Sequence, residues 1–349
     1  MDFKDIINNL FYTPAENWFY SRIPDTQTPG NEPQVQLLAN QHYLRIDLKS
    51  LNIVNRRKFT STYYGMVNSF IKVPMNDGSN MEFNVATTPS QLQNLDGRHV
   101  DRIINIDIPL LGQAPYRGAD IQLQLGLFSI KAGELTEPLV SLFTDMSKTA
   151  GVSFVASALP YAKYLSKSIG ILTGTDNKAE LEIGLSTTLS VVNTGYYAII
   201  RAGSGDIDVA DLTVNEHDYQ LYHYGKPLKG VPYLVFKISC SDLRSNWFQI
   251  PEISKTYLTL QSAVREQRFT DAPKSLQAFK FAILTSIDLL DKDGSRIIKE
   301  VEDKTNSILN MSQTGLNRDF RSGEKRTELK TDMPALSLEL PDLEHIITI

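Results

Sequence analysis

The residues best suited to catalysis or metal binding are five histidines and a single cysteine. The histidines stand at positions 42, 99, 217, 223 and 345, and none belongs to a His-Glu-x-x-His motif. His217 and His223 are six apart, so on one strand they would lie about 20 Å from each other, too far to share a metal ion. We therefore expect no metal and no cofactor. A hydrolase site assembled around His217, His223 and Asp206 from residues distant in the chain stays open.

The cysteine, Cys240, follows an alternating apolar run. The residues that share its face of a predicted strand are Leu234, Phe236 and Ile238. A thiol in such a pattern is typical of core packing rather than of a nucleophile. A catalytic thiol would also need a nearby histidine, for which only His223 offers itself.

Two acidic clusters invite a calcium interpretation, because Ca²⁺ prefers carboxylate oxygens. Asp206, Asp208 and Asp211 share one inter-strand loop and form a weak calcium candidate. A second cluster, at Asp288, Asp291 and Asp293, precedes Gly294 but lacks the glutamate that closes a twelve-residue calcium loop. Helix capping and turn chemistry account for the second cluster.

Other motif matches fail on spacing. Ser69 and Lys72 form Ser-x-x-Lys, but odd spacing on a strand directs the two side chains to opposite faces. The chain contains no phosphate-binding Gly-x-x-x-x-Gly-Lys-Ser/Thr loop, and residues 203–205 lack the outer glycines of a nucleophile elbow. The sequence accordingly predicts a protein that is not an enzyme.

Composition limits the partners. The 349 residues carry a net charge of -5, which disfavours nucleic-acid binding, because phosphate affinity comes from clustered Lys and Arg. Arg56, Arg57 and Lys58 beside aromatic residues form only a small basic patch. One cysteine allows no internal disulfide, and Asp2 and Asp5 stand where a signal peptide would be basic. We expect a cytoplasmic protein.

The elements that must position any site are strands first and helices later. Apolar and polar residues alternate in short runs from about residue 34, and no regular strand-helix alternation recurs, which favours an antiparallel β-sandwich. We expect an α+β fold in which an N-terminal helix and irregular lead (1–33) precedes the sandwich (34–245). A three-helix region (246–311) and a mobile charged tail (312–349) would follow, the helices spanning Glu252–Arg268, Ser275–Leu290 and Ser295–Leu309.

A helical insertion, residues 134–176, interrupts the predicted sandwich. On a helical wheel its second half is apolar over most of the circumference, whereas a helix on one sheet needs only one apolar face. The insertion is long enough to span a bilayer, but Lys163 and Pro160 near its centre disfavour a permanent span. The residues that we expect to engage a partner or a membrane surface are Val152, Phe154, Val155, Leu159, Tyr161, Lys163, Tyr164, Leu165, Lys167 and Ile169.

The functional hypothesis follows from wide apolar surface without a catalytic motif. We expect an interaction or scaffold protein that binds a protein partner or its own copies through the insertion and the tail. Leu336, Leu338 and Leu340 alternate in the tail and suit pairing with a sheet edge. The alternative is a membrane-active effector whose insertion is released toward lipid, with the protein peripheral at a membrane.

Overall fold

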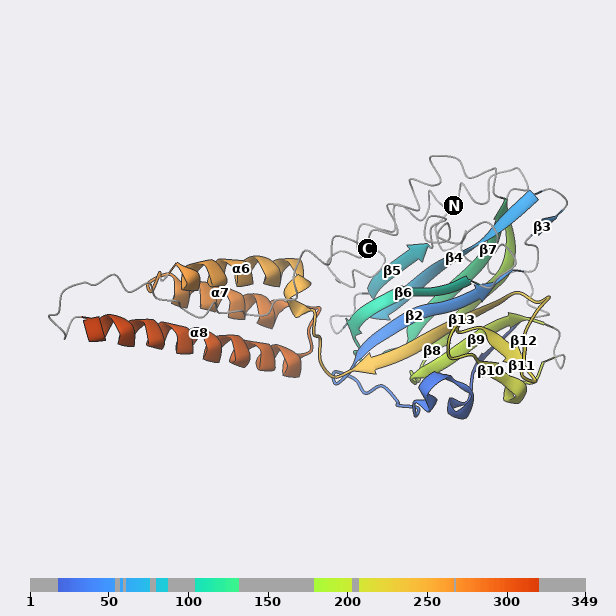
Figure 1. Cartoon of the computed structure of the whole chain (residues 1–349), viewed down its shortest axis with the longest axis horizontal. Helices are drawn as coiled ribbons and strands as arrows, with labels where there is room; N and C mark the ends of the chain where they lie inside the picture. Colours follow the sequence, from blue (N-terminus) through green and yellow to red (C-terminus); the bar gives the residue numbers. More distant parts are fainter. Residues whose placement is uncertain are drawn as a thin grey trace.

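The computed structural model describes residues 18–53, 57–58, 61–75, 80–86, 104–131, 179–202, 207–266 and 268–319. These residues form antiparallel sheets and three α-helices, a mixed α+β fold. Figure 1 shows the strands gathered in one body, from which the helices project at one end as a separate arm. We call helices α6 (Pro251–Arg265), α7 (Ala272–Thr285) and α8 (Asp291–Asp319) together the arm.

The first sheet has the spatial order β1-β9-β13-β2-β6 and is antiparallel throughout. Its strands are β1 (Trp18–Arg22), β2 (Tyr43–Asn52), β6 (Ile104–Pro115), β9 (Gly195–Arg201) and β13 (Tyr233–Ser241). Strand β13, which precedes the arm in the sequence, lies in the middle of this sheet, between β9 and β2. Its pairing with β2 joins the parts of the chain that are farthest apart in the sequence.

The second sheet centres on β4 (Ser61–Pro74), which pairs with β5 (Asn80–Ala86) along one edge and with β7 (Ile121–Lys131) along the other. The short β3 (Arg57–Lys58) pairs with the start of β4, and β8 (Ala179–Leu189) pairs with β7. All of these pairings are antiparallel.

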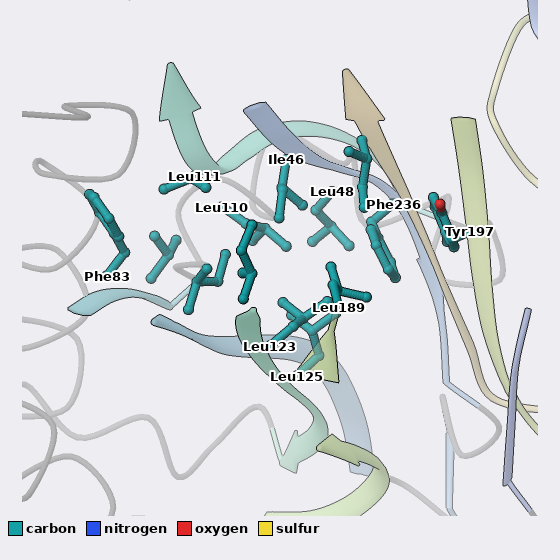
Figure 2. Close-up of a cluster of buried hydrophobic side chains, with 14 of the residues drawn as sticks. Ile46, Leu48, Phe83, Leu110, Leu111, Leu123, Leu125, Leu189, Tyr197 and Phe236 are labelled. Atoms are coloured by element: carbon teal, nitrogen blue, oxygen red, sulfur yellow. The ribbon is translucent and has the colours of Figure 1, made fainter. Parts of the chain in front are cut away.

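The main core lies between the two sheets, because every second residue of each strand points inward. On β7 the inward residues Ile121, Leu123, Leu125 and Leu127 are completely buried. Leucines and isoleucines from β2 and β6 meet them from the first sheet, as Figure 2 shows for Ile46, Leu48, Leu110 and Leu111. The two sheets therefore pack face to face as a sandwich.

A third, small sheet covers the other face of β9 and β13. It consists of β10 (Leu212–Val214), β11 (Leu221–His223) and β12 (Lys226–Pro227). Its buried residues form a second cluster with Tyr196, Ala198 and Tyr233 of the large sheet. This is why β13 is buried on both faces over its first four residues.

The arm consists of α6 (Pro251–Arg265), α7 (Ala272–Thr285) and α8 (Asp291–Asp319). Helix α6 begins with proline, whose fixed φ suits the first helical position, and carries Glu252 in its first turn. Its buried residues, Ile253, Tyr257, Leu260 and Ala263, recur at helical spacing, and the first three pack with Phe279 and Ile283 of α7 and Ile297 of α8. The arm thus has its own hydrophobic core.

The antiparallel sandwich and the C-terminal helical region that the sequence predicts are confirmed. The predicted helical insertion, residues 134–176, lies entirely outside the described residues. Several boundaries differ from expectation. Strand β1 lies inside the predicted irregular lead, and α8 continues to Asp319, past residue 312 where we expected the tail to begin. Helix α7 also starts three residues earlier than predicted, at Ala272, because Pro273 is accepted in a first helical turn.

Candidate interaction surface

The residues predicted to engage a partner, Val152 to Ile169, all lie outside the described residues, as do the tail leucines. The role in partner binding that the sequence predicts for these residues therefore stays a prediction. The remaining candidates, at the histidines, the thiol and the aspartates, fall largely within the described chain.

The calcium candidates have other roles in the described residues. Asp208 caps the short helix Val209–Asp211, its carboxylate accepting a hydrogen bond from Ala210 N at 2.9 Å. The hydroxyl of Tyr224 bonds to Asp211, and this bond raises the pKa of Tyr224. Asp206 lies outside the described residues. Within the described part of the chain, no three His, Cys, Asp or Glu side chains converge as a metal site would require.

The two histidines do not share a strand. His217 lies in a turn in which Asn215 Oδ1 accepts hydrogen bonds from His217 N and Asp218 N, whereas His223 ends β11 and its ring contacts Tyr224. The strand spacing considered for this pair in the sequence analysis therefore does not apply. Turn chemistry of the Asx type explains Asn215 and its neighbours.

Cys240 packs, half-buried, against the core between the sheets. Burial, and then the negative charge of Asp242, raise the pKa of the thiol. A thiol with a raised pKa holds little of the reactive thiolate at neutral pH, which agrees with a packing role.

A polar pocket of about 520 Å³ opens at the edge of the sandwich, between β1 and the end of β8. Its lining includes Tyr20, Gln34, Thr187 and Tyr197. It also includes Arg22, which donates to the Thr194 carbonyl at 3.0 Å and pairs with Asp25. The described lining holds amide, hydroxyl and guanidinium groups but no acid-base pair, so it offers hydrogen bonds rather than catalysis.

The arm is joined to the sandwich by a buried polar network that begins at Tyr43. The ring of this tyrosine, at the start of β2, packs in the core of the arm. Its hydroxyl donates to Asp293 Oδ2 at 2.9 Å and accepts from Leu290 N at 2.9 Å. Burial raises the pKa of Tyr43, and Asp293 adds to this because a second negative charge beside it is unfavourable.

Arg244 completes the network from the segment between β13 and α6. Its guanidinium is fully buried, donates to the Asp288 carbonyl at 2.8 Å and lies 3.6 Å from the Asp288 carboxylate. The backbone N–H of Arg244 donates to Asp293 at 2.8 Å, and Arg296 pairs with the same carboxylate at 2.9 Å. Burial lowers the pKa of Arg244, while the charge of Asp288 opposes that change.

A buried ionic network of this kind tolerates few alternative geometries, because any displaced charge would be left unpaired in a low-dielectric environment. Arg117, from the sandwich, adds a hydrogen bond to the Leu289 carbonyl at 3.1 Å. The arm is therefore held in a fixed orientation, and the surface it presents has a fixed position relative to the sandwich.

The outer face of α7 presents apolar side chains to solvent. Phe281 is 70% exposed and Leu284 is 71% exposed, while Ile287, just after the helix, is 45% exposed. They recur at three-residue intervals, so the two helical ones share a face. We call Phe281, Leu284 and Ile287 the α7 stripe. Large apolar side chains grouped in this way usually mark a binding surface, whereas single exposed ones are ordinary.

The segment that carries the α7 stripe has no charged residue of its own, but charged residues from elsewhere in the chain contact its end. Residues 281–287 include no Asp, Glu, Lys or Arg. Lys280, the residue before Phe281, pairs with Glu302 at 2.6 Å and so joins α7 to α8. Two charged groups reach the C-terminal end of the segment: the Ser286 hydroxyl donates to Glu252 Oε1 at 3.4 Å, and the Arg117 guanidinium donates to the Ile287 carbonyl at 3.5 Å.

Sequence reasoning located helix α7 but missed its stripe. A signal for it was present: apolar residues at 279, 281, 282, 283 and 284 occupy more of the circumference than one buried face uses. The buried network gave no such signal, because its members Tyr43, Arg244 and Asp293 are far apart in the sequence.

None of the described helices is long and apolar enough to cross a membrane. Among known proteins, no family model, no curated protein and no solved structure matches this chain.

Proposed function

We propose that the protein is a non-enzymatic interaction protein that presents a rigidly mounted helical arm to a protein partner. The observation that carries the proposal is the α7 stripe, with two large apolar side chains more than two-thirds exposed on one helical face. Leaving both in water forgoes about 1.5–3 kcal/mol of burial energy for each, which a partner would recover.

The buried network supports the same function. A docking surface binds more tightly when it is preorganised, because less conformational freedom is lost on binding. Tyr43, Arg244 and Asp293 provide that preorganisation by holding the base of the arm to the sandwich. The partner-binding role that the sequence predicts for residues 152–169 and for the tail is compatible with this one and uses different parts of the chain.

A photo-crosslinking experiment tests the proposal in the full-length protein. A benzophenone amino acid replaces Leu284 in one variant and Leu258, which is 54% exposed on α6, in the control. After irradiation in extracts of cells that make the protein, position 284 should give one discrete crosslinked product, whose second component is identified by mass spectrometry. If position 284 yields no more discrete product than position 258, the α7 stripe is not a docking surface.

A further inference from the structure

The pocket between β1 and the end of β8 plays no part in the proposed function of the arm. Its volume of about 520 Å³ lies within the range of about 300–1,000 Å³ that small-molecule sites occupy. Three of its lining residues, Leu189, Val192 and Ile238, belong to the buried core between the two sheets. The pocket therefore reaches from the edge of the sandwich to the margin of its core.

Two stacked tyrosines give the pocket an aromatic wall. Tyr20 of β1 and Tyr197 of β9 both line it, and their ring centroids lie 5.6 Å apart. Tyr197 also stacks on Phe236 of β13 at 5.3 Å, and Figure 2 shows these two rings next to each other. The hydroxyl of Tyr197 donates to the Asn193 carbonyl at 2.9 Å, in the turn between β8 and β9. The wall is thus fixed before any ligand binds, which lowers the entropy lost on binding.

The pocket contains no uncompensated charge. Arg22 is the only charged residue among the described residues that line it. The Arg22 guanidinium pairs with one carboxylate oxygen of Asp25, and the other oxygen accepts a hydrogen bond from Gln34 N at 3.1 Å. An anion would have to compete with Asp25 for the guanidinium, and a cation would find no carboxylate in the lining. The electrostatics therefore favour a neutral ligand.

The polar side chains around the pocket are available for hydrogen bonding. Within the described part of the chain, six lining side chains have hydroxyl or amide groups that bond to no protein atom: Tyr20, Gln34, Thr187, Thr188, Ser190 and Asn193. Hydroxyl and amide groups both donate and accept hydrogen bonds. Tyr20 and Thr187 are half-buried, so their hydroxyls are partly sheltered from water. A ligand that both donates and accepts would satisfy them.

We propose that this pocket binds a neutral carbohydrate. The hydroxyls of a sugar donate and accept, as the lining groups do, while its C–H surface is apolar and suits the wall of Tyr20 and Tyr197. An anion such as phosphate only accepts hydrogen bonds and would need free cationic donors, which the described lining does not supply. The site lies in the sandwich and goes beyond the function proposed for the arm, so either proposal can fail without the other.

Saturation-transfer-difference NMR on the full-length chain tests the proposal with separate neutral sugars at millimolar concentration: glucose, galactose, mannose, N-acetylglucosamine, cellobiose and lactose. At least one of them should receive saturation from the protein. Tyr20→Phe and Thr187→Val each remove one hydroxyl with little change of shape. Each should weaken binding of that sugar about threefold to tenfold, as the loss of one hydrogen bond predicts.

The matched control is Ser186→Ala, which removes an exposed hydroxyl from the neighbouring position of β8, on the opposite face of the strand from Thr187. This variant should bind like the wild type, and thermal unfolding followed by circular dichroism should show that every variant is folded. The proposal is overturned if no neutral sugar receives saturation, or if Tyr20→Phe and Thr187→Val bind as the control does. Tighter binding of glucuronate or of uridine than of any neutral sugar also overturns it, because the ligand would then be an anion or a nucleoside.

Discussion

Removing one hydroxyl from the base of the arm should destabilise it strongly. In Tyr43→Phe the ring stays in the core of the arm, and only the group that donates to Asp293 and accepts from Leu290 N is lost. A hydrogen bond to a charged group contributes about 1.5–3 kcal/mol, and a buried N–H left without a partner costs about 1–3 kcal/mol. Because the two effects overlap, we expect a loss of about 2–4 kcal/mol.

Urea unfolding followed by circular dichroism at the helix band measures this loss directly. The control is Tyr224→Phe, which also removes a bonded hydroxyl, but from a residue that is 72% exposed. It should change the unfolding free energy by no more than about 0.5 kcal/mol. If Tyr43→Phe is as mild as this control, the buried network does not hold the arm, and the fixed orientation of the α7 stripe has no basis.

Three further predictions concern the body of the protein. Burial raises the pKa of the Tyr20 and Tyr43 hydroxyls in the folded protein. Above pH ~10 the unfolded chain therefore loses these phenolic protons before the folded protein does, and the unfolding free energy should fall as pH rises. In a pH series of urea titrations, Tyr43→Phe should make that fall shallower. Gly118→Ala should destabilise the protein more than Gly230→Ala. Both glycines have positive φ, +87° and +80°, which costs an alanine about 1–2 kcal/mol at either position, but only at Gly118 would the added methyl meet a neighbour, Ala39 Cβ at 2.5 Å. The Gly118 variant should therefore have the lower midpoint of thermal unfolding, and equal midpoints would contradict the close approach. Cys240, whose pKa is raised by burial and Asp242, should react with iodoacetamide at pH 8 at least about tenfold more slowly in the folded than in the urea-unfolded protein, and equal rates would show that the thiol is not shielded.

The sequence predicted the sandwich because its strands carry a clear period of two. Along β7, Ile121, Leu123, Leu125 and Leu127 alternate with Gln122, Gln124 and Gly126, and that pattern alone defines the buried face. Strand β1, Trp18–Arg22, has no such alternation, and it is recognised only from its pairing with β9, a contact between distant parts of the chain. Alternation in the sequence therefore reveals strands that have one buried face, but it does not reveal a strand such as β1 that is defined by its pairing with a distant strand.

The candidate surface was less predictable than the fold. Phe281 and Phe279 are chemically the same, yet Phe279 is completely buried and Phe281 is 70% exposed, because the bundle covers only one side of α7. Arg244 and Asp288 are charged residues that sequence reasoning assigns to solvent or to turns, and both are fully buried. Their burial depends on each other and on Tyr43, so it emerges only once the arm and the sandwich have met.

The most direct test of the α7 stripe as a docking surface is hydroxyl-radical footprinting of Phe281, compared with Tyr224 as an equally exposed reference at 72%. Both residues should be oxidised in dilute purified protein. In extracts of cells that make the protein, Phe281 should become protected while Tyr224 stays reactive. Equal oxidation of Phe281 in the two conditions would contradict the account, because it would mean that nothing covers the stripe where the protein works.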